Sequence, residues 1–206
     1  MLGILLRRID GGRGSMSAIE IIAAVLGVAN IALLVRRSIW NYPFGIASVT
    51  FYVVVFRDSL LYSDALLQVF FFVVQIYGWW NWYHARDAEG LAKVDILPNW
   101  ARAAWLGVIV AGTLVEGWYL AHYTSDVAPW MDANTTAISV VAQYLLSVRK
   151  IENWVLWIAT DIVQIGLYAW KGLYPTTVLY TIYLVLSCVG FVEWRRQLRS
   201  RVAASA

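Results

Sequence analysis

Hydrophobic positions fall into seven long runs that are separated by short polar or turn-forming clusters. The runs cover residues 18–35, 40–56, 62–83, 102–122, 132–148, 153–170 and 173–193. Each run is long enough to cross roughly 30 Å of hydrocarbon as a helix. The breaks between the runs are too short for a soluble domain. The pattern therefore predicts an all-α integral membrane protein with seven transmembrane helices.

The composition agrees with this prediction. Hydrophobic residues make up 61% of the chain and charged residues 14%, and the mean hydropathy is +0.63, far from the averages of soluble domains. The single cysteine, Cys188, excludes an internal disulfide. It lies inside an apolar run, so we expect it to pack in the core.

Basic residues are distributed unevenly between the two ends of the predicted bundle. The connections on the C-terminal side carry eleven of them: Arg36, Arg37, Arg86, Lys93, Arg102, Arg149, Lys150, Arg195, Arg196, Arg199 and Arg201. Beyond the N-terminal tail, the opposite connections carry two, Arg57 and Lys171. Cytoplasmic loops are enriched in Lys and Arg, so the C-terminus should be cytoplasmic. The N-terminal tail, residues 1–17, is also basic, although it lies at the end of the bundle opposite the C-terminus. Either it is unstructured or Met16 is the natural start.

The chain also repeats itself. A shift of 112 residues aligns polar, aromatic and glycine positions that general hydrophobicity would not match, among them Asn41 with Asn153, Tyr62 with Tyr174, Gly78 with Gly190 and Trp82 with Trp194. The repeat predicts a tail (1–17), a first three-helix repeat (18–83), a linker helix (100–122), a second three-helix repeat (132–194) and a basic C-terminal tail (195–206). Because the linker crosses the membrane once, both repeats have the same orientation. The result is a parallel 3+1+3 arrangement, which is typical of transporters.

Two of the predicted helices carry a polar stripe along one face. At spacings of three and four, the third run places Asp64, Gln68, Phe71, Gln75, Trp79 and Trp82 together, and the sixth places Asn153, Trp157, Asp161, Gln164 and Tyr168 together. Polar groups within a membrane are costly and usually face a bundle interior or a wet cavity. Each one alone could instead be a hydrogen bond between packed helices. Together, indoles, amides and a carboxylate could bind a flat, polar ligand.

Other residue types indicate no further chemistry. Tryptophans near the ends of the runs are expected to anchor the membrane interface, namely Trp82, Trp100, Trp130 and Trp194. The chain has no HExxH run, and His84 and His122 lie at helix ends, so neither an intramembrane enzyme nor a metal site is expected. No ATP-binding motif is present. No cofactor and no nucleic-acid partner is predicted, and a receptor or scaffold without transport stays a candidate.

Three stretches resemble the motifs of the PnuC vitamin transporters. They are "WNYPFGI" (40–46), "YSDALLQVFFFVVQIYGWWNW" (62–82) and the segment 152–194, which opens with "ENWVLWIATD". The resemblance covers nearly all of the chain after Met16. It implies a fold like that of a full-length SWEET transporter in the bacterial inner membrane, with the N-terminus outside and the C-terminus inside. It also implies a homotrimer and facilitated diffusion, with the vitamin retained through phosphorylation by a cytoplasmic kinase.

The same resemblance suggests the residues of the binding site. It transfers Asn153, Trp154, Trp157, Asp161, Gln75, Trp79 and Asn41, to which the stripes add Gln68, Gln164 and Tyr168. The repeat makes the site asymmetric, because Trp157 aligns with Gly45, Asp161 with Val49 and Gln75 with Ser187. The cargo that we favour is nicotinamide riboside. Thiamine and riboflavin, which relatives of this kind also carry, are the alternatives.

Overall fold

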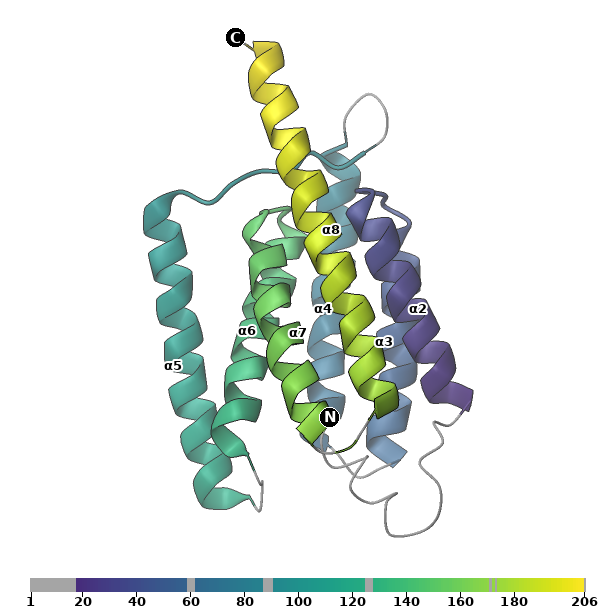
Figure 1. Cartoon of the computed structure of the whole chain (residues 1–206), viewed down its shortest axis with the longest axis vertical. Helices are drawn as coiled ribbons and strands as arrows, with labels where there is room; N and C mark the ends of the chain where they lie inside the picture. The colour runs from purple at the N-terminus through teal and green to yellow at the C-terminus, as the bar shows by residue number, and fades with distance from the viewer. Residues whose placement is uncertain are drawn as a thin grey trace.

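Seven α-helices form the framework in a computed structural model that describes residues 18–58, 62–86, 91–124, 128–170, 172 and 174–205. The helices are α2 (Ala18–Val35), α3 (Asn41–Asp58), α4 (Tyr62–His84), α5 (Asn99–Tyr123), α6 (Pro129–Ser147), α7 (Glu152–Trp170) and α8 (Tyr174–Ser205) (Figure 1). Each predicted run corresponds to one of them. The predicted N-terminal tail lies outside the described residues, whereas the predicted C-terminal tail continues α8 to Ser205.

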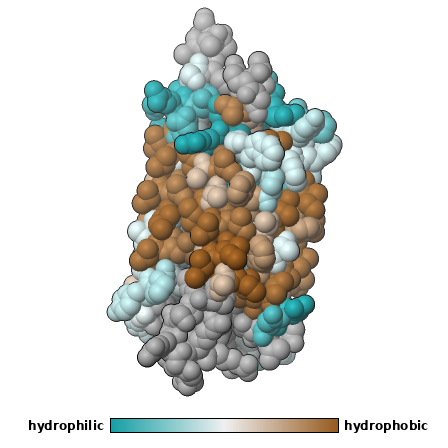
Figure 2. All heavy atoms as spheres, turned by 90° about the vertical axis from the view of Figure 1, so that its right-hand side faces the viewer, coloured by the Kyte–Doolittle hydropathy of each residue, from teal (hydrophilic) through white to brown (hydrophobic). Residues whose placement is uncertain are grey.

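Three of the helices are long and apolar enough to cross a membrane by length and composition alone. They are Ala18–Val35, Asn99–Tyr123 and the part of α8 from Tyr174 to Ser200. The space-filling view agrees, because a broad hydrophobic band lies between hydrophilic residues at the two ends of the molecule (Figure 2). An outward apolar surface is stable when lipid surrounds it. The chain is therefore an all-helical membrane protein.

Six helices pack into a closed ring. The neighbours around it are α2 with α3, α3 with α4, α4 with α6, α6 with α7, α7 with α8, and α8 with α2. Helix α5 lies outside the ring and packs against α6 (Figure 1). One end of the bundle, which we call the basic end, holds the C-terminal ends of α2, α4, α6 and α8 and the start of α5. The connections predicted to carry most of the arginines and lysines lie there.

Two tryptophans hold the basic end together. Trp82 Nε1 of α4 donates a hydrogen bond to the carbonyl of Leu146 at the end of α6 (3.1 Å). Trp194 Nε1 of α8 donates one to the carbonyl of Leu34 at the end of α2 (3.3 Å). Each of these bonds connects neighbouring helices from opposite halves of the chain. Both carbonyls lie in the last helical turn, and each also accepts from the backbone N–H of the following arginine, Arg37 or Arg149 (both 2.9 Å).

The positions of these tryptophans correct one prediction. Trp82 and Trp194 were expected to lie at the membrane interface, yet both side chains are 0% exposed. Their indoles are buried because the ring packs in the core while its N–H reaches a carbonyl across the bundle. Trp100 and Trp130, the other two, are exposed, as an interfacial anchor should be.

The same packing unit occurs twice. Trp82 meets the edge of Tyr42 with ring centroids 5.4 Å apart and planes at 87°, and Trp194 meets Trp154 at 5.5 Å and 88°. Offset by 112 residues, the turns before α3 and α7 each contain an arginine with positive φ, Arg37 at 56° and Arg149 at 60°. Each turn is followed by an asparagine, which is the second residue of the motif "WNYPFGI" or "ENWVLWIATD". Its Nδ2 donates to a carbonyl three residues earlier: Asn41 to Ser38 (2.7 Å) and Asn153 to Lys150 (2.6 Å).

Cys188 is a second correction. It was expected in the core, but its side chain is exposed on α8. Residues on the lipid-facing side of a membrane helix are as apolar as those on the buried side. Hydrophobicity around Cys188 therefore did not reveal which way the thiol points.

Removing either buried indole should destabilise the protein strongly. For Trp82→Ala and Trp194→Ala we expect a loss of about 3–5 kcal/mol each, as is usual when a large core side chain is truncated. Phenylalanine keeps one aromatic ring but loses the hydrogen bond and part of the packed volume, so we expect a smaller loss of about 1–3 kcal/mol. Thermal unfolding in detergent measures both. Trp100→Ala is the matched control. An equal loss of stability in that variant would show that the buried indoles of Trp82 and Trp194 do not hold the basic end together.

Candidate functional site

A short extended segment crosses the basic end of the ring. We call residues 91–97 the strap. Its Ala92 N–H donates to the carbonyl of Arg37 (3.3 Å), and Arg37 Nη1 donates back to the carbonyl of Ala92 (3.2 Å). On the other half, Arg149 Nε donates to the carbonyl of Lys93 (3.0 Å). Equivalent arginines of the two halves thus hold neighbouring residues of one strap.

The strap continues along the second half to the start of α7. Asp95 N–H donates to the carbonyl of Arg149, and the carbonyl of Asp95 accepts from Ile151 N–H, both at 3.0 Å. Lys150 forms an ion pair with the Asp95 carboxylate. Burial lowers the pKa of Arg149, an effect that the negative charge of Asp95 opposes. The guanidinium is charged because an arginine side chain is not deprotonated in proteins. The basic end of the ring is closed by backbone pairing as well as by tryptophans.

Deeper in the ring, the first half contributes amides around a glycine. A Cβ added to Gly45 of α3 would collide with Gln75 Oε1 of α4 and would lie 2.6 Å from Asn30 Nδ2 of α2. Asn30 Nδ2 donates to the carbonyl of Asn41 (2.7 Å). The missing side chain of Gly45 thus lets two amides from neighbouring helices approach the α3 backbone.

The second half contributes a carboxylate. Ser187 Oγ of α8 donates to Asp161 Oδ2 of α7 (3.1 Å), and both residues are buried. At the junction of the halves, a Cβ on Gly27 of α2 would lie 2.8 Å from the hydroxyl of Tyr183 and 3.4 Å from Ser48 Oγ. Polar groups of both halves therefore meet in the middle of the ring.

A group of tyrosines lies near this carboxylate. Tyr180 packs between Tyr168 and Tyr183, with ring centroids 5.2 Å and 5.7 Å away. Asp161 and the phenol of Tyr52 on α3 lie within electrostatic range of Tyr180 and Tyr183. The interior is therefore an aromatic and hydroxyl-rich environment around one buried acid. Such a lining suits a flat ligand with polar edges.

The structure buries most of the predicted site residues within the bundle. Six are buried, namely Asn41, Gln75, Asn153, Trp154, Asp161 and Tyr168. Three are half-buried, namely Gln68, Trp157 and Gln164. Trp79 differs, because 40% of its surface remains exposed. The side chain of Asp64, which the sequence placed on the same stripe, lies outside the described part.

Trp154 and Trp157 occupy different environments. A Cβ on Gly190 would lie 2.5 Å from the Trp154 ring, and Trp194 covers it from another side. Trp154 is therefore wedged in the closed basic end. Trp157 lies one turn deeper and is half-buried. It aligns with Gly45 of the first half, where the absence of a side chain leaves room for the amides of that same half. Of the two indoles, Trp157 is better placed to meet a ligand.

Some buried polar atoms have no hydrogen-bond partner within the described ranges. Among them are Asn153 Oδ1 and Gln164 Oε1, both on the predicted stripe of α7. Buried polar atoms are nearly always paired in native proteins, so water or a ligand is the expected partner of these two atoms. In the same ranges, no group of three or more His, Cys, Asp or Glu residues is arranged to hold a metal ion.

Several residues of this interior were not predicted from the sequence. They are Asn30, Gly45, Ser48, Tyr52, Tyr180, Tyr183 and Ser187. One signal for two of them was available, since the repeat aligns Ser187 with Gln75 and Gly45 with Trp157. A residue that aligns with a candidate shares its position relative to the ring, so the repeat register would have extended the site.

A family model described as "Nicotinamide mononucleotide transporter" matches residues 17–196, which include α2 to α7 and most of α8. The chain belongs to this family. Its members are transporters, so the protein is a membrane transporter and not an enzyme. The PnuC resemblance stated from the motifs is confirmed.

Individual members of the family match this chain over most of their length. The nicotinamide riboside transporter PnuC of Escherichia coli (strain K12) is 28% identical over 218 residues, 94% of this chain and 91% of the relative. The riboflavin/roseoflavin transporter RibM of Streptomyces davaonensis is 30% identical over 185 residues, 88% and 85% of the two chains. A solved structure, "Crystal structure of the Vitamin B3 transporter PnuC", matches with a TM-score of 0.75 at 26% identity, covering 97% of this chain and 89% of that one.

A methyl group at Gly190 should disrupt the wedge around Trp154. The rigid indole cannot move aside easily, so we expect Gly190→Ala to lower the free energy of unfolding by about 1–3 kcal/mol. Gly166 on α7 has nothing within 4 Å of an added Cβ, and Gly166→Ala should be neutral or stabilise by up to about 1 kcal/mol. Unfolding midpoints in detergent compare the two. If both variants behave alike, Trp154 is not tightly wedged.

Proposed function

We propose that this protein imports nicotinamide riboside by facilitated diffusion. The observation that carries the proposal is a membrane-transporter family match over residues 17–196 combined with a buried carboxylate, Asp161, in the middle of the ring. Several relatives bear the name of a nicotinamide riboside transporter. After entry, a cytoplasmic kinase would phosphorylate the riboside and so prevent its return.

The architecture that we propose is the parallel 3+1+3 arrangement. Residues 18–83 and 132–194 form the two repeats, and the helix that contains residues 100–122 links them outside the ring. The doubled units of Trp82 with Leu146 and Trp194 with Leu34, 112 residues apart, support a two-fold relation between the halves. The label of a SWEET-like homotrimer rests on the family resemblance alone.

We also propose that the basic end faces the cytoplasm of the bacterium, as the enrichment of Lys and Arg in cytoplasmic loops predicts. The protein would then be a multi-pass protein of the inner membrane with its C-terminus inside. The strap and the two tryptophans would close the cytoplasmic exit in this conformation. Transport would require the two halves to separate at that end.

Within the ring, we propose that the cargo contacts Gln75, Trp157, Asp161 and Gln164, with Asn41, Gln68, Asn153 and Tyr168 around them. Trp154 and Trp79 would act at the border of this site. Nicotinamide riboside carries a positive charge on its pyridinium ring. A carboxylate attracts such a charge strongly in an interior of low dielectric constant, and an aromatic face such as that of Trp157 favours it further.

The second candidate cargo is riboflavin, because one relative at 30% identity is a riboflavin/roseoflavin transporter. Its ring system is flat and neutral. An amide- and tyrosine-lined interior could bind it through stacking and hydrogen bonds, but the buried carboxylate would then have no cationic partner. The charge of Asp161 therefore favours the pyridinium riboside.

Transport should follow the gradient of the cargo alone. We expect proteoliposomes that contain the purified protein to take up labelled nicotinamide riboside equally with and without ATP, sodium or proton gradients, because the chain has no ATP-binding motif. Liposomes without protein are the control. Accumulation of free riboside above the outside concentration under an imposed ion gradient would contradict facilitated diffusion. Binding without any flux would support a receptor.

The charge of Asp161 should favour the cationic riboside over its neutral reduced form. Asp161→Asn keeps the shape of the side chain, and we expect the affinity for nicotinamide riboside to fall about tenfold, or about 1.4 kcal/mol. The reduced riboside, which is neutral, should bind the variant with little change. Titration calorimetry measures both affinities. Ser187→Ala, which keeps the charge, and Trp157→Ala, which removes a stacking face for both forms, are the controls.

Equal losses for both forms in Asp161→Asn would show that the carboxylate acts as a hydrogen-bond acceptor and not as the partner of a cation. Unchanged affinity for both would place Asp161 outside the site.

A further inference from the structure

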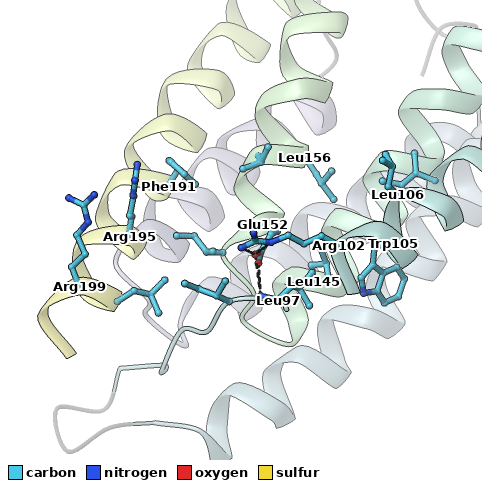
Figure 3. Close-up of a pocket in the computed structure, with 15 residues that line it drawn as sticks. Leu97, Arg102, Trp105, Leu106, Leu145, Glu152, Leu156, Phe191, Arg195 and Arg199 are labelled. Atoms are coloured by element: carbon cyan, nitrogen blue, oxygen red, sulfur yellow. Dashed lines mark hydrogen bonds and ion pairs between the residues drawn. The ribbon is translucent and has the colours of Figure 1, made fainter. Parts of the chain in front are cut away.

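A groove of about 900 Å³ lies on the outside of the ring at the basic end. Helices α5 and α8 form its two walls, and α7, the end of α6 and the strap form its floor. Figure 3 shows Arg195 and Arg199 on one side, Trp105 and Leu106 on the other, and the paired Glu152 and Arg102 between them. None of the proposed cargo-binding residues lines it. The groove is therefore separate from the interior site.

Both walls change from charged to apolar in the same direction. On α8, Arg199, Arg195 and Phe191 are spaced by four residues and lie on one face, with the arginines toward the basic end. On α5, Arg102 is followed deeper along the helix by Leu106 and Ile109. A molecule that fits this groove would have a polar head near the basic end and an apolar body along the helices.

The charges along the rim are not balanced. Arg102 donates from Nε (2.9 Å) and Nη2 (2.8 Å) to Glu152 Oε1, which also accepts from the strap at Leu97 N–H (3.1 Å). This pair holds α5 and the strap to α7 and is neutral. The side chains of Arg195 and Arg199 are exposed and make no hydrogen bond or ion pair with the described residues. Two positive charges therefore remain at the head of the groove.

The arginine end of the groove is expected at the depth of lipid headgroups. The basic end borders the hydrophobic band of the surface (Figure 2), and Trp100, at the start of α5, is 74% exposed, as is typical of an interfacial anchor. Basic pockets between membrane helices on the cytoplasmic side are suited to anionic lipid headgroups. A free phosphate would leave the long apolar walls without a partner, and the cationic riboside would be repelled.

We propose that this groove is a binding site for one anionic phospholipid. The phosphate lies between Arg195 and Arg199, and an acyl chain runs along Leu106, Val155 and Phe191. Such a lipid fills the space between α5 and the ring, beside the packing of α5 against α6. It would therefore fix the linker helix to α7 and α8 of the second half.

Native mass spectrometry of the full chain in detergent tests this site directly. The protein is titrated with phosphatidylglycerol and, in parallel, with zwitterionic phosphatidylethanolamine, without any cargo. We expect one tightly bound phosphatidylglycerol and a reduction of its affinity by at least tenfold in the double variant Arg195→Gln and Arg199→Gln. The matched control is Arg36→Gln with Arg196→Gln, which removes two exposed arginines of the same end that do not line the groove.

Further variants separate the alternatives. Val155→Trp fills the groove without changing its charge and should also reduce lipid binding, whereas a purely electrostatic attraction would survive it. Equal losses in both double variants would overturn the proposal, as would displacement of the lipid by millimolar inorganic phosphate. A change in subunit number in the groove variants, with lipid binding unchanged, would identify the groove as an interface between copies and contradict the lipid site.

Discussion

The exchange of tryptophan hydrogen bonds between the two halves is the interaction on which the rest of the structure depends. Trp82 reaches the last turn of α6, and Trp194 reaches the last turn of α2. Neither bond can form within one half, so the ring closes only when both halves are present. In an interior without water, a lost bond leaves the buried indole N–H unpaired, whereas each carbonyl still accepts from the backbone N–H of Arg37 or Arg149. The two bonds therefore specify how the halves meet as well as stabilise them.

A symmetric frame of this kind supports an asymmetric interior. The closing units of the two halves match residue by residue, down to Gly78 against Tyr42 and Gly190 against Trp154. One turn deeper the match ends, because Gly45 and Gln75 in the first half correspond to Trp157 and Ser187 in the second. A ligand in the middle would meet amides on one side and an indole with a carboxylate on the other. The strap, which belongs to the connection between α4 and α5, ties the two halves together at the basic end.

Much of this could be predicted from the sequence, for identifiable reasons. Seven apolar runs predict seven helices because the length of a span is fixed by the membrane, and the repeat predicted which residues of the halves are equivalent. The direction in which side chains point was harder to predict. Lipid and protein interior are both apolar, so a membrane helix lacks the amphipathic signal that orients a helix in water. For that reason Trp82, Trp194 and Cys188 were misplaced, while polar residues such as Asp161 and Gln75, whose burial in lipid is costly, were correctly expected inside. Sequence alone also did not predict that the tryptophans bond across the halves.

The two tryptophan bonds close one end of the ring, and we propose that they open together during transport. Fluorine NMR of protein labelled with 5-fluorotryptophan, with the Trp82 and Trp194 signals assigned by Trp82→Phe and Trp194→Phe, measures this directly. The account predicts two exchanging environments for each indole, with minor populations that are equal at the two sites and shift by the same fraction when nicotinamide riboside is added. A shift at one indole only, or fixed signals at both during measurable exchange of cargo, would contradict it.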